Sequence, residues 1–230
     1  MILQRDAQPG GRFRALAFLL LLGVGAVAGG CSKAKPPTPP DPAPGPRLAP
    51  ADVVNALQWA YRHRDATVYG KLLADDFQFW FDPATRPDNV PEFWTRLQDS
   101  TGTGNLFRAA DVSDIRITLT FGSDVPVNVA GQERWRKIRV TDTFLEVDKV
   151  PLTGEVITFR VDGDVQDFYV RQGRSPADTL AASPTAREWF LVEWRDLARL
   201  SALAAGTPRG ARPEVEQPNT WGSLKGRYSR

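Results

Sequence analysis

The sequence is poor in the residues that most metal and redox sites use. Among 230 residues there is one cysteine, one histidine and one methionine. A lone cysteine excludes an internal disulfide bond, and one histidine is too few for a zinc cluster of the usual kind. No serine lies in the nucleophile-elbow pattern, and no glycine-rich stretch has the spacing that cradles a phosphate. The sequence therefore predicts no metal site and no cofactor.

Long apolar runs are also lacking, but a short one lies near the N-terminus. Residues 1–14 contain three arginines and one aspartate, and an apolar run follows from Ala15 to Ala28. This run is shorter than the ~20 apolar residues of a membrane-spanning helix. A basic start, a short apolar core and small residues before a cut are typical of a secretory signal. The segment Val27-Ala28-Gly29-Gly30-Cys31 resembles the lipobox that lipoprotein signal peptidase cuts.

This resemblance implies a bacterial lipoprotein with a signal peptide over residues 1–30 and lipid on Cys31. The only cysteine of the chain falls where a lipobox requires it. The alternative is an ordinary signal peptide followed by a cysteine that carries no lipid. Stable anchoring takes two or more acyl chains, so the membrane is the first expected partner. Ser32 stands where an aspartate would favour the inner membrane, and the outer membrane of the cell envelope is therefore favoured.

A proline-rich stretch separates this cysteine from the rest. Eight of the fifteen residues from Pro36 to Pro50 are proline. Proline fixes φ and donates no hydrogen bond, so the stretch favours the extended polyproline II form. At ~3.1 Å per residue it would reach roughly 45 Å. Residues 31–50 are thus predicted to be a lipidated tether, and a proline-rich recognition ligand is the alternative.

Charge excludes one class of partner. The chain has 29 basic and 27 acidic residues, but residues 1–30 contain three arginines and one aspartate. The remainder is therefore balanced in charge, and it has no basic stripe of the kind that binds nucleic acid. No nucleic-acid partner is expected.

Residues 51–205 are predicted to form one domain that begins with helices. Apolar residues at helical spacing predict a helix over 51–63, which Pro50 can start, and a second over 66–74 after a break at Arg64-Asp65. A third helix is expected from Asn89 onward, with Val90, Phe93, Trp94 and Leu97 inward and with Gly102 and Gly104 closing it.

The period of the apolar residues then changes from helical spacing to two. The parity of the apolar residues switches between Val140 and Leu145, which indicates a β-bulge. Asp162-Gly163 is expected to form a tight hairpin turn. Helices first and strands after indicate an α+β fold with a curved antiparallel sheet of about five to six strands and helices on one face. The predicted strands lie at 77–81, 115–121, 134–147, 157–161, 165–170 and 188–195.

One segment resembles a known superfamily. From Val53 to Pro83 a helix, the Arg64-Asp65 turn, a second helix and the step Leu72-Leu73-Ala74-Asp75-Asp76-Phe77 look like the opening of nuclear-transport-factor-2-like (SnoaL-like) proteins. The layout is similar over roughly residues 51–196. The resemblance implies a cone-shaped fold with the three N-terminal helices on the concave face of the sheet and a pocket between them. It does not decide the activity, because the superfamily hosts isomerases, dehydratases, hydrolases and non-catalytic members.

Five residues are candidates for lining such a pocket: Tyr61, Trp80, Asp82, Asp142 and Asp167. An acid that points into an apolar cavity would have a raised pKa and could exchange protons. The strand parity leaves the directions of Asp142 and Asp167 open, with exposure beside the bulge favoured for Asp142.

The catalytic sets of the superfamily do not map onto this chain. Asp82-Pro83 resembles the end of the first strand in ketosteroid isomerases, but Leu57 stands where those enzymes have a tyrosine. The single histidine, His63, cannot supply the pair that scytalone-dehydratase types use. No catalytic residue is therefore assigned.

The C-terminal segment, residues 206–230, contains two large apolar residues. Trp221 and Leu224 are apolar and would be exposed to water in a free tail. The segment is therefore predicted to fold back onto the domain. Binding of a partner is the alternative. The sequence thus favours an envelope lipoprotein with a non-catalytic domain that binds a small apolar ligand or an envelope protein. The alternative is a pocket enzyme of the isomerase, dehydratase or hydrolase type that uses carboxylates such as Asp142.

Overall fold

The computed structural model describes residues 41–86, 88, 90–152, 154–178, 187–197 and 220–228. The predicted signal peptide and Cys31 lie outside these residues. One compact unit runs from Pro42 to Arg230. None of the helices within the described ranges is long and apolar enough to cross a membrane.

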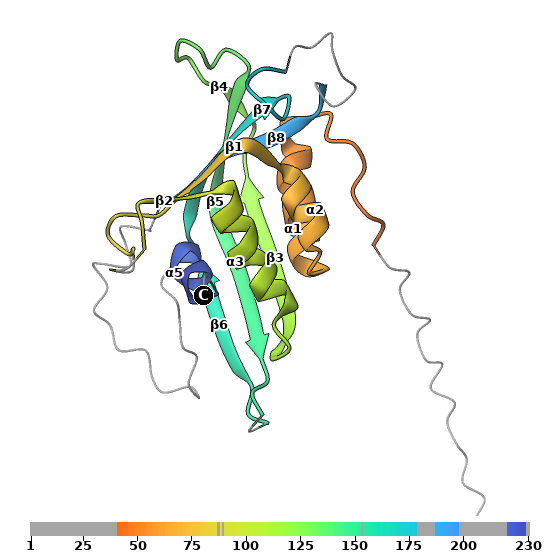
Figure 1. Cartoon of the computed structure of the whole chain (residues 1–230), viewed down its shortest axis with the longest axis vertical. Helices are drawn as coiled ribbons and strands as arrows, with labels where there is room; N and C mark the ends of the chain where they lie inside the picture. The colour runs from red at the N-terminus through yellow and green to blue at the C-terminus, as the bar shows by residue number, and fades with distance from the viewer. Residues whose placement is uncertain are drawn as a thin grey trace, which may run out of the picture. The chain divides into compact units, whose positions relative to one another are not determined.

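The described chain contains four helices and eight strands (Figure 1), an α+β fold as predicted. The helices are α1 (Pro50–Arg62), α2 (Ala66–Leu72), α3 (Arg96–Arg108) and α5 (Trp221–Arg227). The strands are β1 (Leu73–Trp80), β2 (Phe93–Thr95), β3 (Val112–Phe121), β4 (Val125–Pro126), β5 (Trp135–Lys149), β6 (Ile157–Asp162), β7 (Val165–Gln172) and β8 (Trp189–Leu197).

The first two helices form where the sequence predicts them. Pro50 begins α1, where its missing N–H leaves no bond unmade. Arg64 has a φ of 53°, which breaks the helix, and the Asp65 side chain accepts hydrogen bonds from the first turn of α2. The Arg64 guanidinium also donates to the backbone carbonyl of Phe107 at 2.8 Å and that of Val112 at 2.7 Å. This corner therefore ties α1 and α2 to the end of α3.

The predicted start of the third helix is wrong by seven residues. Phe93 and Trp94 belong to the short strand β2, which pairs with β1, and α3 begins only at Arg96. Leu97, predicted to point inward, is 75% exposed. Gly102 lies inside α3, where a Cβ would come within 3.2 Å of the Trp94 ring. Gly102 therefore lets the helix pass closely over Trp94 instead of ending it.

The sheet is curled and mixed rather than antiparallel throughout. Its strand order is β2-β1-β8-β7-β5-β3, with β4 and β6 also paired to β5. The pair β1–β8 is parallel, and it joins the first and the last strand of the described chain. The sheet has eight strands where five to six were predicted, and α1 and α3 lie on the side toward which it curls (Figure 1).

The predicted bulge in β5 is confirmed. Thr120 pairs with Asp142, but the next residue, Phe121, pairs with Val140, so Thr141 is the extra residue. The shift keeps Val140 and Leu145 both in the core although they are five positions apart.

The predicted hairpin at Asp162-Gly163 is wrong. Strands β6 and β7 pair with the same strand, β5, one after the other and in the same direction. They therefore form one long strand that is interrupted where the Gly163 N–H donates to the Thr143 carbonyl at 2.8 Å. Gly163 has a φ of 77°, which suits a bulge as well as a turn. The dipeptide Asp162-Gly163 therefore does not by itself distinguish a bulge from a hairpin turn.

The end of the proline-rich stretch is held against the sheet. The Trp189 N–H donates to the Arg47 carbonyl at 2.9 Å, and the Arg47 guanidinium lies 4.8 Å from the Phe190 ring centroid. A salt bridge to Glu188 at 2.6 Å adds to this contact. The last residues of the predicted tether, residues 31–50, thus belong to the compact unit.

Candidate functional site

The interior between the sheet and the helices contains α5, the C-terminal helix. Trp221 and Leu224 are buried in the same core as Tyr61 on α1. The Trp221 indole N–H donates to the Tyr61 hydroxyl at 3.2 Å, and its ring packs edge-on against Trp194 at 4.8 Å. The resemblance implies a ligand pocket between the sheet and the helices. Beside Tyr61, the side chains of α5 fill this space.

Two buried carboxylates hold the start of α5. The Gly222 N–H donates to Asp196 Oδ2 at 2.7 Å, and the Trp221 N–H donates to Asp164 Oδ2 at 3.3 Å. A Cβ at Gly222 would lie 2.7 Å from Phe81 and 2.8 Å from Asp196, so only glycine fits. Burial raises the pKa of Asp196 to about 6. These acids cap the backbone of α5 and are not open to a substrate.

A buried ion pair holds the last turn of α5. Lys225 is 1% exposed, and its ammonium contacts Asp99 of α3, which is fully buried. The Tyr69 hydroxyl completes the group: it donates to Asp99 and lies 3.1 Å from Lys225 Nζ. Burial lowers the pKa of Lys225 and, together with the Asp99 charge, raises the pKa of Tyr69. Each charge is neutralised by its neighbour, as a buried pair requires.

Aromatic rings surround the same ammonium. Lys225 Nζ lies 4.2 Å from the Trp194 ring centroid, 4.3 Å from that of Phe79 and 5.6 Å from that of Tyr69. Cations over aromatic faces within about 6 Å are attracted by the ring quadrupole. The group formed by Tyr69, Phe79, Asp99 and Trp194 is called the ammonium cage below.

The structure does not gather the five predicted pocket residues in one place. Tyr61 alone lies in the interior beside α5. Trp80 lies on the other face of β1 and stacks near Phe93 at 4.9 Å. Asp82 accepts a hydrogen bond from the Ala84 N–H at 2.7 Å, a turn contact. It nevertheless lies near enough to Asp196 to contribute to the raised pKa of that residue.

The other two candidates, Asp142 and Asp167, lie on the outer face of the sheet. Asp142 is exposed beside the bulge. Asp167 is nearly buried but forms ion pairs with Arg139 and with Lys137, the latter at 3.5 Å. Neither carboxylate points toward the interior, so a pocket enzyme that uses them is not supported by their positions.

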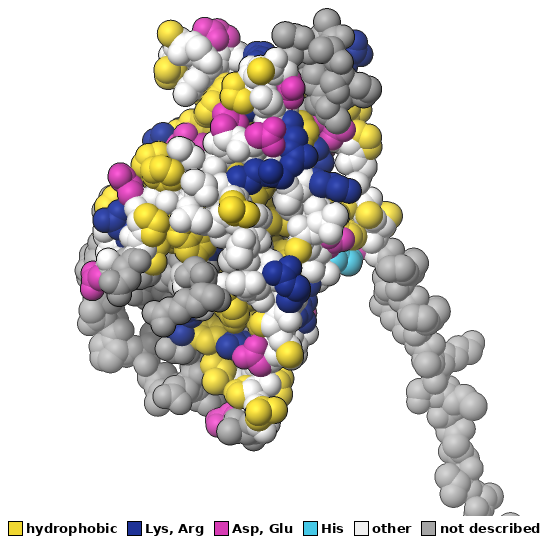
Figure 2. Space-filling view, viewed as in Figure 1, with side chains coloured by type: hydrophobic (Ala, Val, Ile, Leu, Met, Phe, Trp, Pro, Cys, Tyr) yellow, Lys and Arg dark blue, Asp and Glu magenta, His cyan; other side chains and the backbone are white. Residues whose placement is uncertain are grey.

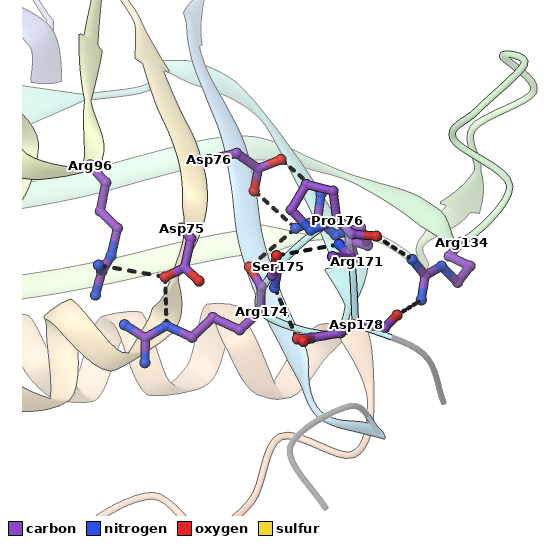
Figure 3. Close-up of polar contacts among 10 residues, drawn as sticks. Asp75, Asp76, Arg96, Arg134, Arg171, Arg174, Ser175, Pro176 and Asp178 are labelled. Carbon is purple, nitrogen blue, oxygen red and sulfur yellow. Dashed lines mark hydrogen bonds and ion pairs between the residues drawn. The ribbon is translucent and has the colours of Figure 1, made fainter. Parts of the chain in front are cut away.

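A second polar group lies on the surface, where β1 begins. Asp75 is bound by Arg174 at 3.0 Å and by Arg96 at 3.6 Å (Figure 3). Its neighbour Asp76 accepts two hydrogen bonds of 2.9 Å from Arg171, which is 3% exposed. Figure 2 shows basic side chains gathered beside acidic ones on the face that β1 and α2 cross.

Two clefts meet at Asp76. One of about 520 Å³ lies between the start of β1 and the start of α3 and is lined by Asp75, Arg96 and Leu97 among others. The second, of about 320 Å³, is lined by Arg134, Trp135 and Arg171. Both therefore present charged groups of both signs, and the first also presents the exposed Leu97. This pair of clefts is called the Asp76 clefts. Within the described ranges, no cluster of three or more His, Cys, Asp or Glu side chains could hold a metal ion.

Asp99, Asp196 and Lys225 were not among the predicted site residues. A signal existed for Lys225, because Trp221, Leu224 and Lys225 are spaced to share one helix face. The predicted inward face, which included Leu97, concealed Asp99, because the buried face of α3 is the one that carries Asp99 and Leu106. Asp196 lay at the end of a predicted strand, with nothing in the local pattern to mark it.

No protein-family model and no curated protein matches the chain. Solved structures do align with it. A conserved protein from Planctomyces limnophilus is 19% identical over 65% of this chain and 93% of its own, with a TM-score of 0.45. A nuclear-transport-factor-2-like protein of unknown function in nutrient uptake from Rhodospirillum rubrum is 20% identical over 65% of this chain and 98% of its own, with a TM-score of 0.37.

A third structure is a ketosteroid isomerase-like protein from Erwinia carotovora atroseptica. It is 13% identical over 64% of this chain and 91% of its own, with a TM-score of 0.37. The chain is similar to these structures at low sequence identity. This similarity concerns the fold and does not extend to an activity.

Proposed function

We propose that the chain is an envelope lipoprotein, anchored through lipid on Cys31, whose folded unit binds another envelope protein at the Asp76 clefts without catalysis. The outer membrane is the proposed location. The supporting features of the anchor are the lipobox-like segment and the position of the only cysteine. The unit would then be held at the membrane by the residues between Cys31 and Arg47.

The observation that carries the binding role is the composition of the clefts. Leu97 is 75% exposed beside the paired charges of Asp75 and Arg96. Protein interfaces are enriched in arginine and have an apolar centre with a polar rim, and Leu97 beside Arg96 matches that composition. A partner that covers Leu97 would bury it and strengthen the surrounding ion pairs by excluding water.

A photo-crosslinking residue at Leu97 tests this role in cells. Leu152 supplies the matched control, because it is a fully exposed leucine in the turn after β5. The proposal expects one discrete adduct from position 97, none from position 152, and loss of the adduct in an Asp76→Arg chain. Equal labelling from both positions, or none from position 97, would contradict it.

The anchor is tested separately by labelling with palmitate. The unaltered chain should gain label and stay with the membrane, whereas a Cys31→Ser chain should do neither. If the Cys31→Ser chain is still labelled, the lipid is elsewhere and the proposed anchor is wrong. Separation of inner and outer membranes then tests the location.

A second candidate is a pocket enzyme, and one observation favours it. Asp196 is a buried acid whose pKa of about 6 lies near neutrality, as acid–base catalysis requires. In the structure this carboxylate binds the Gly222 N–H, so a substrate would have to displace α5. Turnover of a steroid-like or epoxide substrate that an Asp196→Asn change abolishes would favour the enzyme over the binding domain.

A further inference from the structure

The ammonium cage has the composition of a ligand site rather than of an ordinary core. Its carboxylate, Asp99, is fully buried and faces one cation, Lys225. The rings of Trp194 and Phe79 lie 4.2 and 4.3 Å from that cation. A carboxylate with aromatic rings around it is the arrangement that proteins use to recognise ammonium groups of ligands.

A second part of the site lies one helical turn away. The Trp221 indole fits between Tyr61 and Trp194, with ring centroids at 5.1 and 4.8 Å, and donates its N–H to the Tyr61 hydroxyl. Trp221 and Lys225 are four positions apart on α5, so the helix presents an aromatic ring and an ammonium side by side. The pair of groups matches, in chemistry, an arylalkylammonium compound.

Polar atoms that nothing satisfies face the same interior. Gln166 of β7 is fully buried, and neither its amide oxygen nor its amide nitrogen has a hydrogen-bond partner. The Trp194 indole N–H and the Thr143 hydroxyl are also buried without partners. Buried polar groups are normally paired, because an unpaired one costs about 1–3 kcal/mol. These three side chains thus present buried hydrogen-bonding groups with which α5 forms no bond.

The segment that fills this interior is short. Helix α5 has seven residues, fewer than an isolated helix needs to be stable in water. It is held by side chains and two caps, and no strand pairing ties it to the sheet. Its Lys225 must also give up its hydration when it enters the cage, which offsets part of the attraction to Asp99.

From these observations we infer that the interior beneath α5 is a binding site for arylalkylammonium ligands, which the chain's own Trp221 and Lys225 fill when no ligand is bound. The ammonium of the ligand replaces that of Lys225 at Asp99, and its ring replaces the Trp221 indole beside Tyr61. This site is separate from the Asp76 clefts. A test of one site therefore does not decide the other.

Chemical rescue of a Lys225→Ala chain tests the cage directly. This change removes three methylenes and the ammonium, which together correspond to propylammonium. In the polypeptide from Ser32 to Arg230, added propylammonium chloride should raise the lowered melting temperature by about 2–4 °C. Propanol and sodium chloride at the same concentration are the controls for the apolar part and the salt. A second change, Asp99→Asn, should abolish the rescue. The cage is refuted if propanol stabilises as well as propylammonium does.

The unaltered chain provides a test that does not depend on a variant that folds. Tryptamine should bind and displace α5, so the amide hydrogens of α5 should exchange with solvent faster. Tryptophol, which carries a hydroxyl in place of the ammonium, should leave the exchange unchanged. Unchanged exchange of α5 with saturating tryptamine, or equal acceleration by tryptophol, overturns the inference.

Discussion

Replacing Asp196 by asparagine should change how the stability of the protein depends on pH. Asp196 is 2% exposed, and its Oδ2 accepts the Gly222 N–H at 2.7 Å. Asparagine keeps the shape and a carbonyl oxygen that can accept this bond, but it cannot ionise. The variant therefore removes the titration with little change in packing.

The size of the effect follows from the pKa. Burial raises the pKa of Asp196 from 3.8 to about 6, so between these two pH values the folded chain holds a proton that the unfolded chain has lost. Stability from this group is greatest below pH 3.8, falls as the pH rises, and is constant above about 6. One pH unit corresponds to about 1.4 kcal/mol, so the total loss is about 3 kcal/mol.

Urea unfolding across this pH range measures the effect. Other carboxylates titrate there too, but they contribute equally to both chains and cancel in the difference. The free energy of unfolding of the Asp196→Asn chain, relative to the unaltered chain, should rise by about 3 kcal/mol from pH 3.5 to pH 7. Parallel curves for the unaltered and Asp196→Asn chains would refute the reasoning.

Three further changes probe α5 and the interrupted strand. Gly222→Ala should destabilise by about 1–3 kcal/mol, although alanine favours helices, because its Cβ would lie 2.7 Å from Phe81; an unchanged melting temperature would contradict this. Trp221→Ala should cost about 3–5 kcal/mol in urea unfolding, and a cost below 1 kcal/mol would mean that α5 is not part of the core. Gly163→Ala should cost about 1–2 kcal/mol because φ is 77°, whereas Gly122→Ala, with open space around it, should be near neutral in thermal unfolding.

Much of the fold could be predicted because it depends on short-range chemistry. The spacing of Val53, Val54 and Leu57 is enough to place α1, and alternation along Ile115 and Ile117 is enough to place β3. The bulge in β5 also left a trace, since one extra residue reverses the parity of every apolar position after it. Failures occurred where two structures share one local pattern, as at Gly163.

The candidate site was predictable only in part. Tyr61 was placed in the interior correctly by its position on the apolar face of α1. Asp142 and Asp167 were chosen by strand parity, and parity cannot say which side of a curled sheet is covered by helices. Asp142 and Asp167 therefore lie on the outer face, whereas Asp99 and Asp196, which were not chosen, lie inside.

The sequence by itself determined α1, α2 and the long strands β3 and β5, the balance of charge and the place of the single cysteine. These properties follow from composition and from patterns a few residues long. Only the tertiary structure decided that β1 and β8 pair in parallel, and that α5 fills the interior. The bond from Lys225 to Asp99 joins residues 126 positions apart. Such a pairing is set by which surfaces remain to be covered once the sheet has curled, and no local pattern contains that information.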